Sequence, residues 1–206
     1  MKQNIAQSAL ILAIATLGLT AIQAESFDFK DPKGVNNVRF TLDAPLESTS
    51  GTASGISGTV EFDPAHPENT SGTITLETNT LMVPNSMMRD HLLGENWMNA
   101  EKYPEITFET TGAETEQSDD NVFELAVTGK LTVKGITKEI TVPVTLNYLP
   151  GKLADRTGGK LQGDLLVLRT SFTITRSDFG INAGQYEDKV SDEIALKLSI
   201  AGAAVK

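Results

Sequence analysis

Hydrophobic and polar residues alternate with a period of two along most of the chain. In the stretch 136–148, Ile140, Val142 and Val144 share one face, and threonines occupy much of the other. Successive side chains of a strand point to opposite sides of a sheet, so this alternation predicts a strand with one dry and one wet face. Similar alternation recurs in the segments 38–42, 59–63, 72–82, 105–110, 122–133, 164–175 and 192–200. About eight strands, separated by turns that carry glycine, asparagine and proline, predict an all-β sandwich or barrel.

Two local features qualify these predicted strands. Pro143 lies inside 136–148, and proline has no N–H for a ladder hydrogen bond, so it indicates a sheet edge or a bulge. The segment 114–121, with the sequence ETEQSDDN, is polar throughout and predicts an acidic hairpin loop between two strands.

One segment departs from the period of two, between residues 85 and 93. Residues at helical spacing there are Met87, Met88, His91 and Leu92. Asn85 or Ser86 can serve as the N-cap and Gly94 as the stop, which predicts a short helix. A single short helix cannot carry the core of an all-β chain, so we expect it to plug or cover one end of the sheet structure.

The first 24 residues have the layout of a secretory signal peptide. Lys2 is followed by an apolar run and then by small and polar residues that end at Ala24. The run is shorter than the ~18 apolar residues that a membrane helix needs, and no later segment approaches that length. We therefore expect residues 1–24 to be removed and residues 25–206 to form one domain, periplasmic or secreted, without stable membrane insertion.

Charge and cysteine content narrow the possible functions. The net charge is −10, and an acidic surface repels nucleic acid and anionic lipid headgroups. We therefore expect no nucleic-acid partner. The chain has no cysteine, which excludes disulfides, thiolate catalysis and zinc–thiolate sites, and its length is sufficient to fold around an apolar core without disulfides.

The best candidates for chemistry are Arg89, Asp90 and His91. Adjacent residues on a helix point in different directions, so Asp90 is badly placed to orient His91, and the sequence has no G-x-S-x-G motif. His66 and His91 are the only histidines, and no metal-ligand motif or phosphate-binding glycine loop surrounds them. We expect no catalytic residue, no metal ligand and no cofactor.

Three longer blocks identify a family resemblance. HLLGENWMNAEKYPEITF (91–108), VTGKLTVKGITKEITVPV (127–144) and TITRSDFGI (173–181) closely resemble, in order and spacing, blocks of the YceI-like family. The resemblance runs from about Ser26 to Ala203. It implies an exported, eight-stranded antiparallel lipocalin-like barrel, with one short inserted helix, that holds a polyisoprenoid lipid.

The resemblance also implies roles for individual residues. By position, the motif residues that correspond to those of the family are Arg89, Asp90, His91, Trp97, Met98, Tyr103, Pro104, Arg176, Asp178, Phe179 and Gly180. The family does not make these residues catalytic; it implies the walls and mouth of a lipid pocket. With the inward faces of the strands added, the expected ligand-binding residues are Phe40, Phe62, Leu76, Arg89, His91, Leu92, Trp97, Tyr103, Phe108, Ile140, Val142, Phe172 and Arg176.

The front of the chain departs from the family pattern. Family members usually carry Asp-Pro followed by His-Ser, and another histidine at the end of the first strand. Here Gly34, Val35 and Asn36 stand near the first of these histidines, and no histidine follows Leu42. The ligand contacts that the family makes through these histidines are therefore not carried over to this chain.

The expected mechanism is burial of an isoprenoid or isoprenoid-quinone-like chain against dry walls. The helix around His91 and the segment around Trp97 would flank the opening, where Arg89, Arg176 or Tyr103 meets a polar head such as a diphosphate or a quinone ring.

Two alternatives remain open on the residues alone. One is an exported enzyme that acts on an apolar substrate with His91 as general base. The other is an interaction module, because an eight-stranded barrel can be filled by its own side chains. Neither the lipid nor the oligomeric state follows from the sequence.

Overall fold

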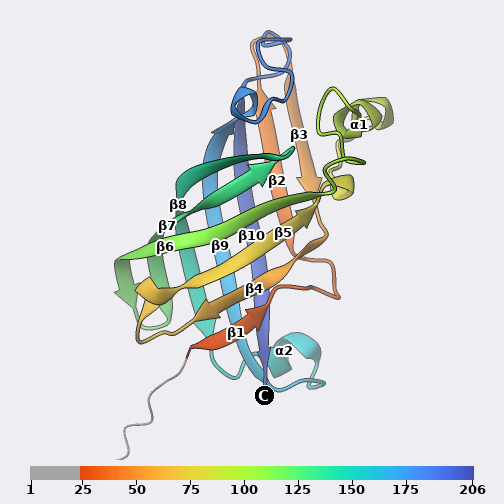
Figure 1. The fold of residues 1–206 in the computed structure, drawn as a ribbon. Helices are drawn as coiled ribbons and strands as arrows, with labels where there is room; N and C mark the ends of the chain where they lie inside the picture. Colours follow the sequence, from red (N-terminus) through yellow and green to blue (C-terminus); the bar gives the residue numbers. More distant parts are fainter. Residues whose placement is uncertain (1–23) are drawn as a thin grey trace, which may run out of the picture.

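Residues 24–206 are described by the structure, a computed structural model, and they form a closed antiparallel barrel (Figure 1). Apart from Ala24, the expected signal peptide lies outside the described residues. The strands of the single sheet are β1 (Glu25–Asp28), β2 (Asn37–Asp43), β3 (Ser48–Ala53), β4 (Ile56–Phe62), β5 (Ser71–Glu77), β6 (Glu105–Asp119), β7 (Val122–Val133), β8 (Ile136–Leu149), β9 (Gly163–Thr175) and β10 (Glu193–Val205).

Eight of these strands form the closed ring. Their order is β1, β4, β5, β6, β7, β8, β9 and β10, and β10 returns to β1 through the pair Asp28 and Ala203. The expected eight-stranded antiparallel barrel is thus confirmed. The hairpin of β2 and β3 is added to this ring, because β2 pairs with β10 beyond the point where β1 leaves it.

Asn36 holds the joint between β1, β2 and β10. Its side-chain amide donates to the carbonyl oxygens of Phe29 at 3.0 Å and Ala201 at 3.1 Å, and its Oδ1 accepts from the N–H of Ala201 at 2.9 Å. The side chain is buried. The residue that stands near a family histidine therefore serves in this chain as a staple between strands.

The strands agree with the alternation of the sequence at most positions. The prediction for 122–133 has the same bounds as β7, and the 136–148 prediction differs from β8 by one residue. The expected strand at 72–82 ends at Glu77, where Thr78–Thr80 begins a 3-10 helix. The pattern did not predict β1 or β3.

The expected acidic loop is largely strand instead. β6 continues to Asp119, with register shifts between Thr110 and Gly112 and between Thr115 and Gln117, and the turn to β7 lies at residues 120–121. Most side chains of this part of β6 are exposed. The prediction was wrong because alternation reveals only strands with a dry face, and here the partner β7 supplies the buried residues.

Pro143 does mark a sheet edge. β8 pairs with β7 along most of its length, but it pairs with β9 only from Val144 onwards, where Val144 faces Thr170. In Figure 1, β8 first runs beside β7 and then turns to run alongside β9. The eight residues 136–143 are therefore unpaired on their β9 side.

The expected helix is α1, Ser86–Leu93. Asn85 is its N-cap, since its side chain accepts a hydrogen bond from the Met88 N–H at 3.0 Å, and Gly94 is the C-cap. A second helix, α2 (Leu153–Thr157), was not predicted, and 3-10 turns lie at Pro67–Asn69, Thr78–Thr80 and Arg176–Phe179 (η1, η2 and η3). Among residues 24–206, neither α-helix has the length and apolar character needed to cross a bilayer.

A candidate ligand cavity inside the barrel

The barrel contains a cavity of about 220 Å³ between β2, β4–β6 and β7–β10. One water molecule needs roughly 10–15 Å³ of such space, so the interior is hollow rather than filled by side chains. Apart from Arg176 and four threonines, the side chains in the lining are apolar. Such a cavity is suited to an uncharged hydrocarbon chain.

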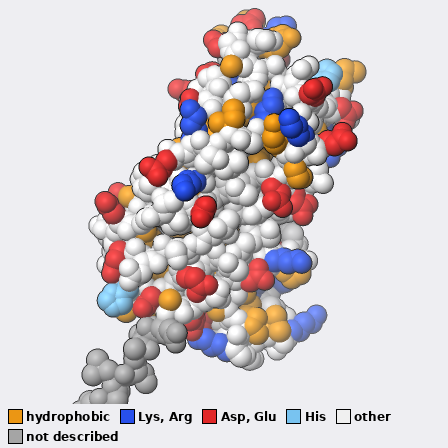
Figure 2. Space-filling model, viewed as in Figure 1, with side chains coloured by type: hydrophobic (Ala, Val, Ile, Leu, Met, Phe, Trp, Pro, Cys, Tyr) orange, Lys and Arg blue, Asp and Glu red, His pale blue; other side chains and the backbone are white. Residues whose placement is uncertain are grey.

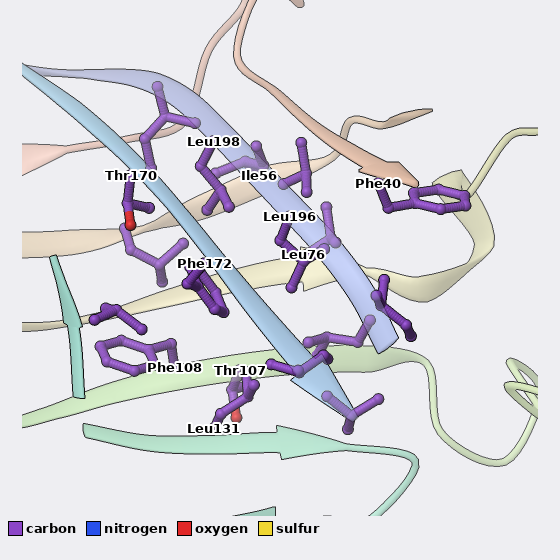
Figure 3. A pocket seen from close by; sticks show the side chains of 18 of the residues that line it. Phe40, Ile56, Leu76, Thr107, Phe108, Leu131, Thr170, Phe172, Leu196 and Leu198 are labelled. Atoms are coloured by element: carbon purple, nitrogen blue, oxygen red, sulfur yellow. The ribbon is translucent and has the colours of Figure 1, made fainter. Parts of the chain in front are cut away.

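The inward positions of the strands supply the walls. Figure 3 shows Phe172, Leu196 and Leu198 of β9 and β10 on one side of the cavity, and Leu76 and Phe108 of β5 and β6 on the other. The outer surface differs: Figure 2 shows acidic and basic side chains spread over the face in view, with hydrophobic side chains in small groups between them.

Aromatic rings pack against one another at the end of the barrel where β1 lies, here called the floor. Phe62 lies 5.1 Å from Phe123 and 6.0 Å from Tyr148, measured between ring centroids, and Phe27 lies 6.2 Å from Tyr148. Phe62 was expected in the cavity wall, but this packing places it in the floor, outside the residues that line the cavity.

Beneath the rings, a charged cluster around Asp164 holds the start of β9. The buried carboxylate of Asp164 accepts hydrogen bonds from the Tyr148 hydroxyl at 2.6 Å, Lys206 Nζ at 2.8 Å and the Gly151 N–H at 2.8 Å. Burial alone would raise the pKa of Asp164, but these hydrogen bonds outweigh it and lower the pKa to about 2. Burial and the same hydrogen bond raise the pKa of Tyr148. This end of the barrel is firmly held.

Arg176 organises the opposite end, where the loop 181–192 caps the barrel. Its side chain is fully buried. All five of its N–H groups donate to backbone carbonyl oxygens of that loop, those of Ile181, Asn182, Gln185, Val190 and Ser191. Arg176 also lies 3.8 Å from the carboxylate of Asp192.

The hydrogen bonds of Arg176 bear directly on the contact with a polar head that was expected at the rim. A guanidinium has five donors, and here the cap loop occupies every one. Arg176 does line the cavity, but an anionic headgroup would have to displace backbone carbonyls to reach it. Arg176 therefore holds the cap and has no free donor for a diphosphate.

Two other expected polar contacts lie outside the cavity. Arg89 is on α1, and its Nη2 donates to the Asn79 carbonyl at 3.2 Å, which ties the helix to η2. His91 is exposed on the same helix and is not among the lining residues. The interpretation of His91 as general base for a substrate in the cavity has no support from this placement.

Tyr103 and Ile140 are also outside the lining. Tyr103 packs beneath the β7–β8 turn, where a Cβ on Gly135 would lie 2.6 Å from its ring. Ile140 is half-buried against the core. Nearby, Lys134 Nζ donates to the carbonyls of Asn96 and Gly180 at 3.2 Å each, and burial lowers the pKa of Lys134.

The remaining expected residues do line the cavity: Phe40, Leu76, Leu92, Trp97, Phe108, Val142, Phe172 and Arg176. Leu92 is the contribution of α1, whose residues are otherwise half-buried or exposed. Leu81 and Ile181 line it as well but lie in loops, where no periodic pattern could reveal them. Within residues 24–206, no group of three or more His, Asp and Glu side chains is placed to hold a metal ion.

Comparison with known proteins agrees with this architecture. Residues 22–202 match the model of the YceI-like domain. Protein YceI of Salmonella newport (strain SL254) is 29% identical over an alignment of 209 residues that covers 100% of both chains.

Two solved structures are also similar to the chain. BcnA of Burkholderia cenocepacia is 26% identical, with a TM-score of 0.66, over 81% of this chain and 95% of that one. A polyisoprenoid binding domain from Saccharophagus degradans, implicated in plant cell wall breakdown, is 9% identical, with a TM-score of 0.62, over 88% and 99%. The second likeness shows the fold alone. Since the family model spans all the strands of the barrel except the end of β10, the chain belongs to the YceI-like family.

Proposed function

We propose that this protein binds one long apolar chain of the isoprenoid class inside its barrel, as an exported carrier and not as an enzyme. The observation that carries the proposal is the hollow, almost wholly apolar interior. Burial of each CH₂ group there is worth about 0.8 kcal/mol, so a long chain gains enough to offset the cost of its immobilisation.

The choice of an isoprenoid is supported by the fold relative from Saccharophagus degradans, which is described as polyisoprenoid binding. The chemical nature of the ligand's polar head is inferred from Arg176, because the cap loop engages all five of its hydrogen-bond donors. A neutral head, such as a quinone or an alcohol, fits the cavity better than a diphosphate. Export is supported by the signal-peptide layout of the first 24 residues.

Native mass spectrometry of protein isolated from a bacterial periplasm tests this function directly, followed by organic extraction and identification of the bound species. The expected result is one isoprenoid per barrel. A mass without ligand that persists after incubation with isoprenoid quinones would contradict the proposal.

A pair of adjacent substitutions on β10 supplies the matched control. Leu196 points into the cavity, whereas its neighbour Ala195 is exposed and is not among the lining residues. Leu196→Trp should occupy the space of the ligand and reduce the amount of bound lipid, and Ala195→Trp should leave it unchanged. Equal lipid content in the two variants would place the ligand somewhere other than this cavity.

A further inference from the structure

A long stretch of the barrel wall between β8 and β9 has no ladder hydrogen bonds. The ladder between these strands ends at Val144 and Thr170, yet β8 extends over 136–143 and β9 over 171–175 beyond that point. Over this stretch β8 still pairs with β7, and β9 still pairs with β10. The two edges are therefore held by their outer neighbours and not by each other.

The unpaired stretch borders the cavity from both sides. Val142 of β8 and Phe172 and Ile174 of β9 line the interior. A hollow on the outer surface lies at one end of this stretch, over the last pairs of the ladder, and is lined by residues 143–145 and 169–171 among others. Val144 and Thr170 line both the inner cavity and the outer hollow. The wall between solvent and cavity is thin where the ladder ends.

The ends of the stretch are fastened by side chains. At the ladder end, the Thr170 hydroxyl donates to the Pro143 carbonyl at 2.6 Å, and Pro143 has no N–H to offer in return. At the cap end, Lys138 Nζ lies 3.6 Å from Asp178 Oδ1, and both side chains are half exposed. Separation of the strands between these points breaks no ladder hydrogen bond.

Both ends of the barrel are held more firmly than this stretch of wall. The cap is held by the five hydrogen bonds of Arg176. The floor is held by the packed aromatic rings and by the hydrogen bonds of Asp164. Entry of a ligand through the cap or the floor would disrupt buried contacts, whereas entry between β8 and β9 would displace exposed ones.

We propose that the gap between residues 136–143 of β8 and 171–175 of β9 is the entry slot through which the apolar chain passes sideways into the cavity. This inference rests on the proposed function. A chain that enters sideways passes between Val142 and Phe172 directly into the cavity, so neither the cap nor the floor has to open.

A reversible cross-link across the slot tests the proposal. The chain has no cysteine of its own, so an introduced pair is unique. If the ladder register continued from Thr145 and Arg169, Thr141 would face Thr173, and both of these side chains are exposed. A short bis-methanethiosulfonate linker would bridge T141C and T173C, and a thiol reductant would remove it. The control pair is N147C with V167C, which bridges strands that are already paired and lines neither the cavity nor the outer hollow.

Loading is followed through Trp97, the chain's single tryptophan, which lines the cavity. The probe is a short-chain isoprenoid quinone offered in phosphatidylcholine vesicles, and its arrival quenches the Trp97 emission. Bridging the slot should lower the rates of loading and unloading by at least about tenfold, because a gate controls rates. The final quenching should not change, and the reductant should restore the rates. The control bridge should have no effect.

Thr170→Val gives a second test in the opposite direction, since it removes the bond to Pro143 while it keeps the side-chain volume. Its loading rate should rise. The entry slot would be overturned if the protein with the bridged slot loaded as fast as the protein without a bridge. It would also be overturned if the control bridge slowed loading to the same extent. Absence of quenching in the unmodified protein would overturn the proposed function itself.

Discussion

The guanidinium carbon of Arg176 lies 5.9 Å from the centroid of the Trp97 ring, at the capped end of the cavity. The two residues come from distant parts of the chain, η3 and the segment after α1, and both line the cavity. Of the lining residues, only Arg176 carries a charge. The contact with Trp97 and the hydrogen bonds to the cap loop explain how the charge of Arg176 can be buried without a bound anion.

Replacement of Arg176 by lysine should destabilise the protein. Lysine has three donors on a flexible stem and cannot reproduce a planar set of five, so buried carbonyls of the cap loop lose their partners. The free energy of unfolding should fall by about 3 kcal/mol or more, measured by urea denaturation with circular dichroism. Arg169→Lys, on the exposed face of β9, should change it by less than about 0.5 kcal/mol. Equal stability of the two variants would contradict the assigned role.

Asn36 and Asn37 offer a comparison of adjacent residues with the same side chain. Asn36 is buried and makes three hydrogen bonds that join β1 and β2 to β10, whereas Asn37 makes one exposed bond, to the Val35 carbonyl at 2.8 Å. Asn36→Ala should lower the free energy of unfolding by about 1–3 kcal/mol because it leaves buried backbone groups unpaired. Asn37→Ala should have little effect. Similar urea midpoints for the two variants would show that the staple does not matter.

Much of the barrel could be predicted from alternation, because a strand with one face toward a hollow interior and one toward water has a clear period of two. The bounds of β7 were found in this way, and the fold class followed from the family resemblance. β3 was missed because its sequence, STSGTA, has small and polar residues at nearly every position. Such a strand depends on its partner β2 for position.

The site was predicted less completely than the fold. Phe40, Leu76 and Phe172 could be expected in the cavity lining because they occupy inward strand positions. The position of His91 and Arg89 outside the cavity lining could not be predicted, because helical spacing does not say which face of an inserted helix meets the barrel. The engagement of all five hydrogen-bond donors of Arg176 depends on the path of the twelve-residue loop 181–192. This loop has no periodic pattern from which its path could be predicted.

Glycine at position 129 makes room for one wall of the cavity. Gly129 of β7 is buried, and an added Cβ would overlap the ring of Phe108 and lie 2.6 Å from the Glu109 carbonyl oxygen. Gly129→Ala should therefore push Phe108 into the cavity, lower the free energy of unfolding by about 1–3 kcal/mol and weaken quinone quenching of Trp97. In Gly112→Ala the new Cβ meets nothing within 4 Å, so this variant is the control. If the two variants matched in stability and quenching, the packing of Phe108 on Gly129 would not shape the cavity.

Asp164 should make the free energy of unfolding depend on pH in the acid range. Its carboxyl has an ordinary pKa of 3.8 and a pKa of about 2 in the folded protein, so between these values the unfolded chain binds more protons. The stabilising contribution is present above about pH 4 and is lost as the pH falls toward 2, with a total of about 2 kcal/mol.

Urea denaturation of the wild type and of Asp164→Asn, at intervals from pH 2 to pH 6, measures this contribution as the difference between the two curves. The amide retains the shape of the side chain but not its charge, so the gap should be widest at pH 5–6 and should close as the pH falls through the window below 4. Asp43→Asn, which alters an exposed carboxylate of β2, should follow the wild type throughout. A gap between wild type and Asp164→Asn that stays constant with pH would mean that the Asp164 carboxylate does not act through its charge in holding Tyr148 and Lys206 at the floor of the barrel.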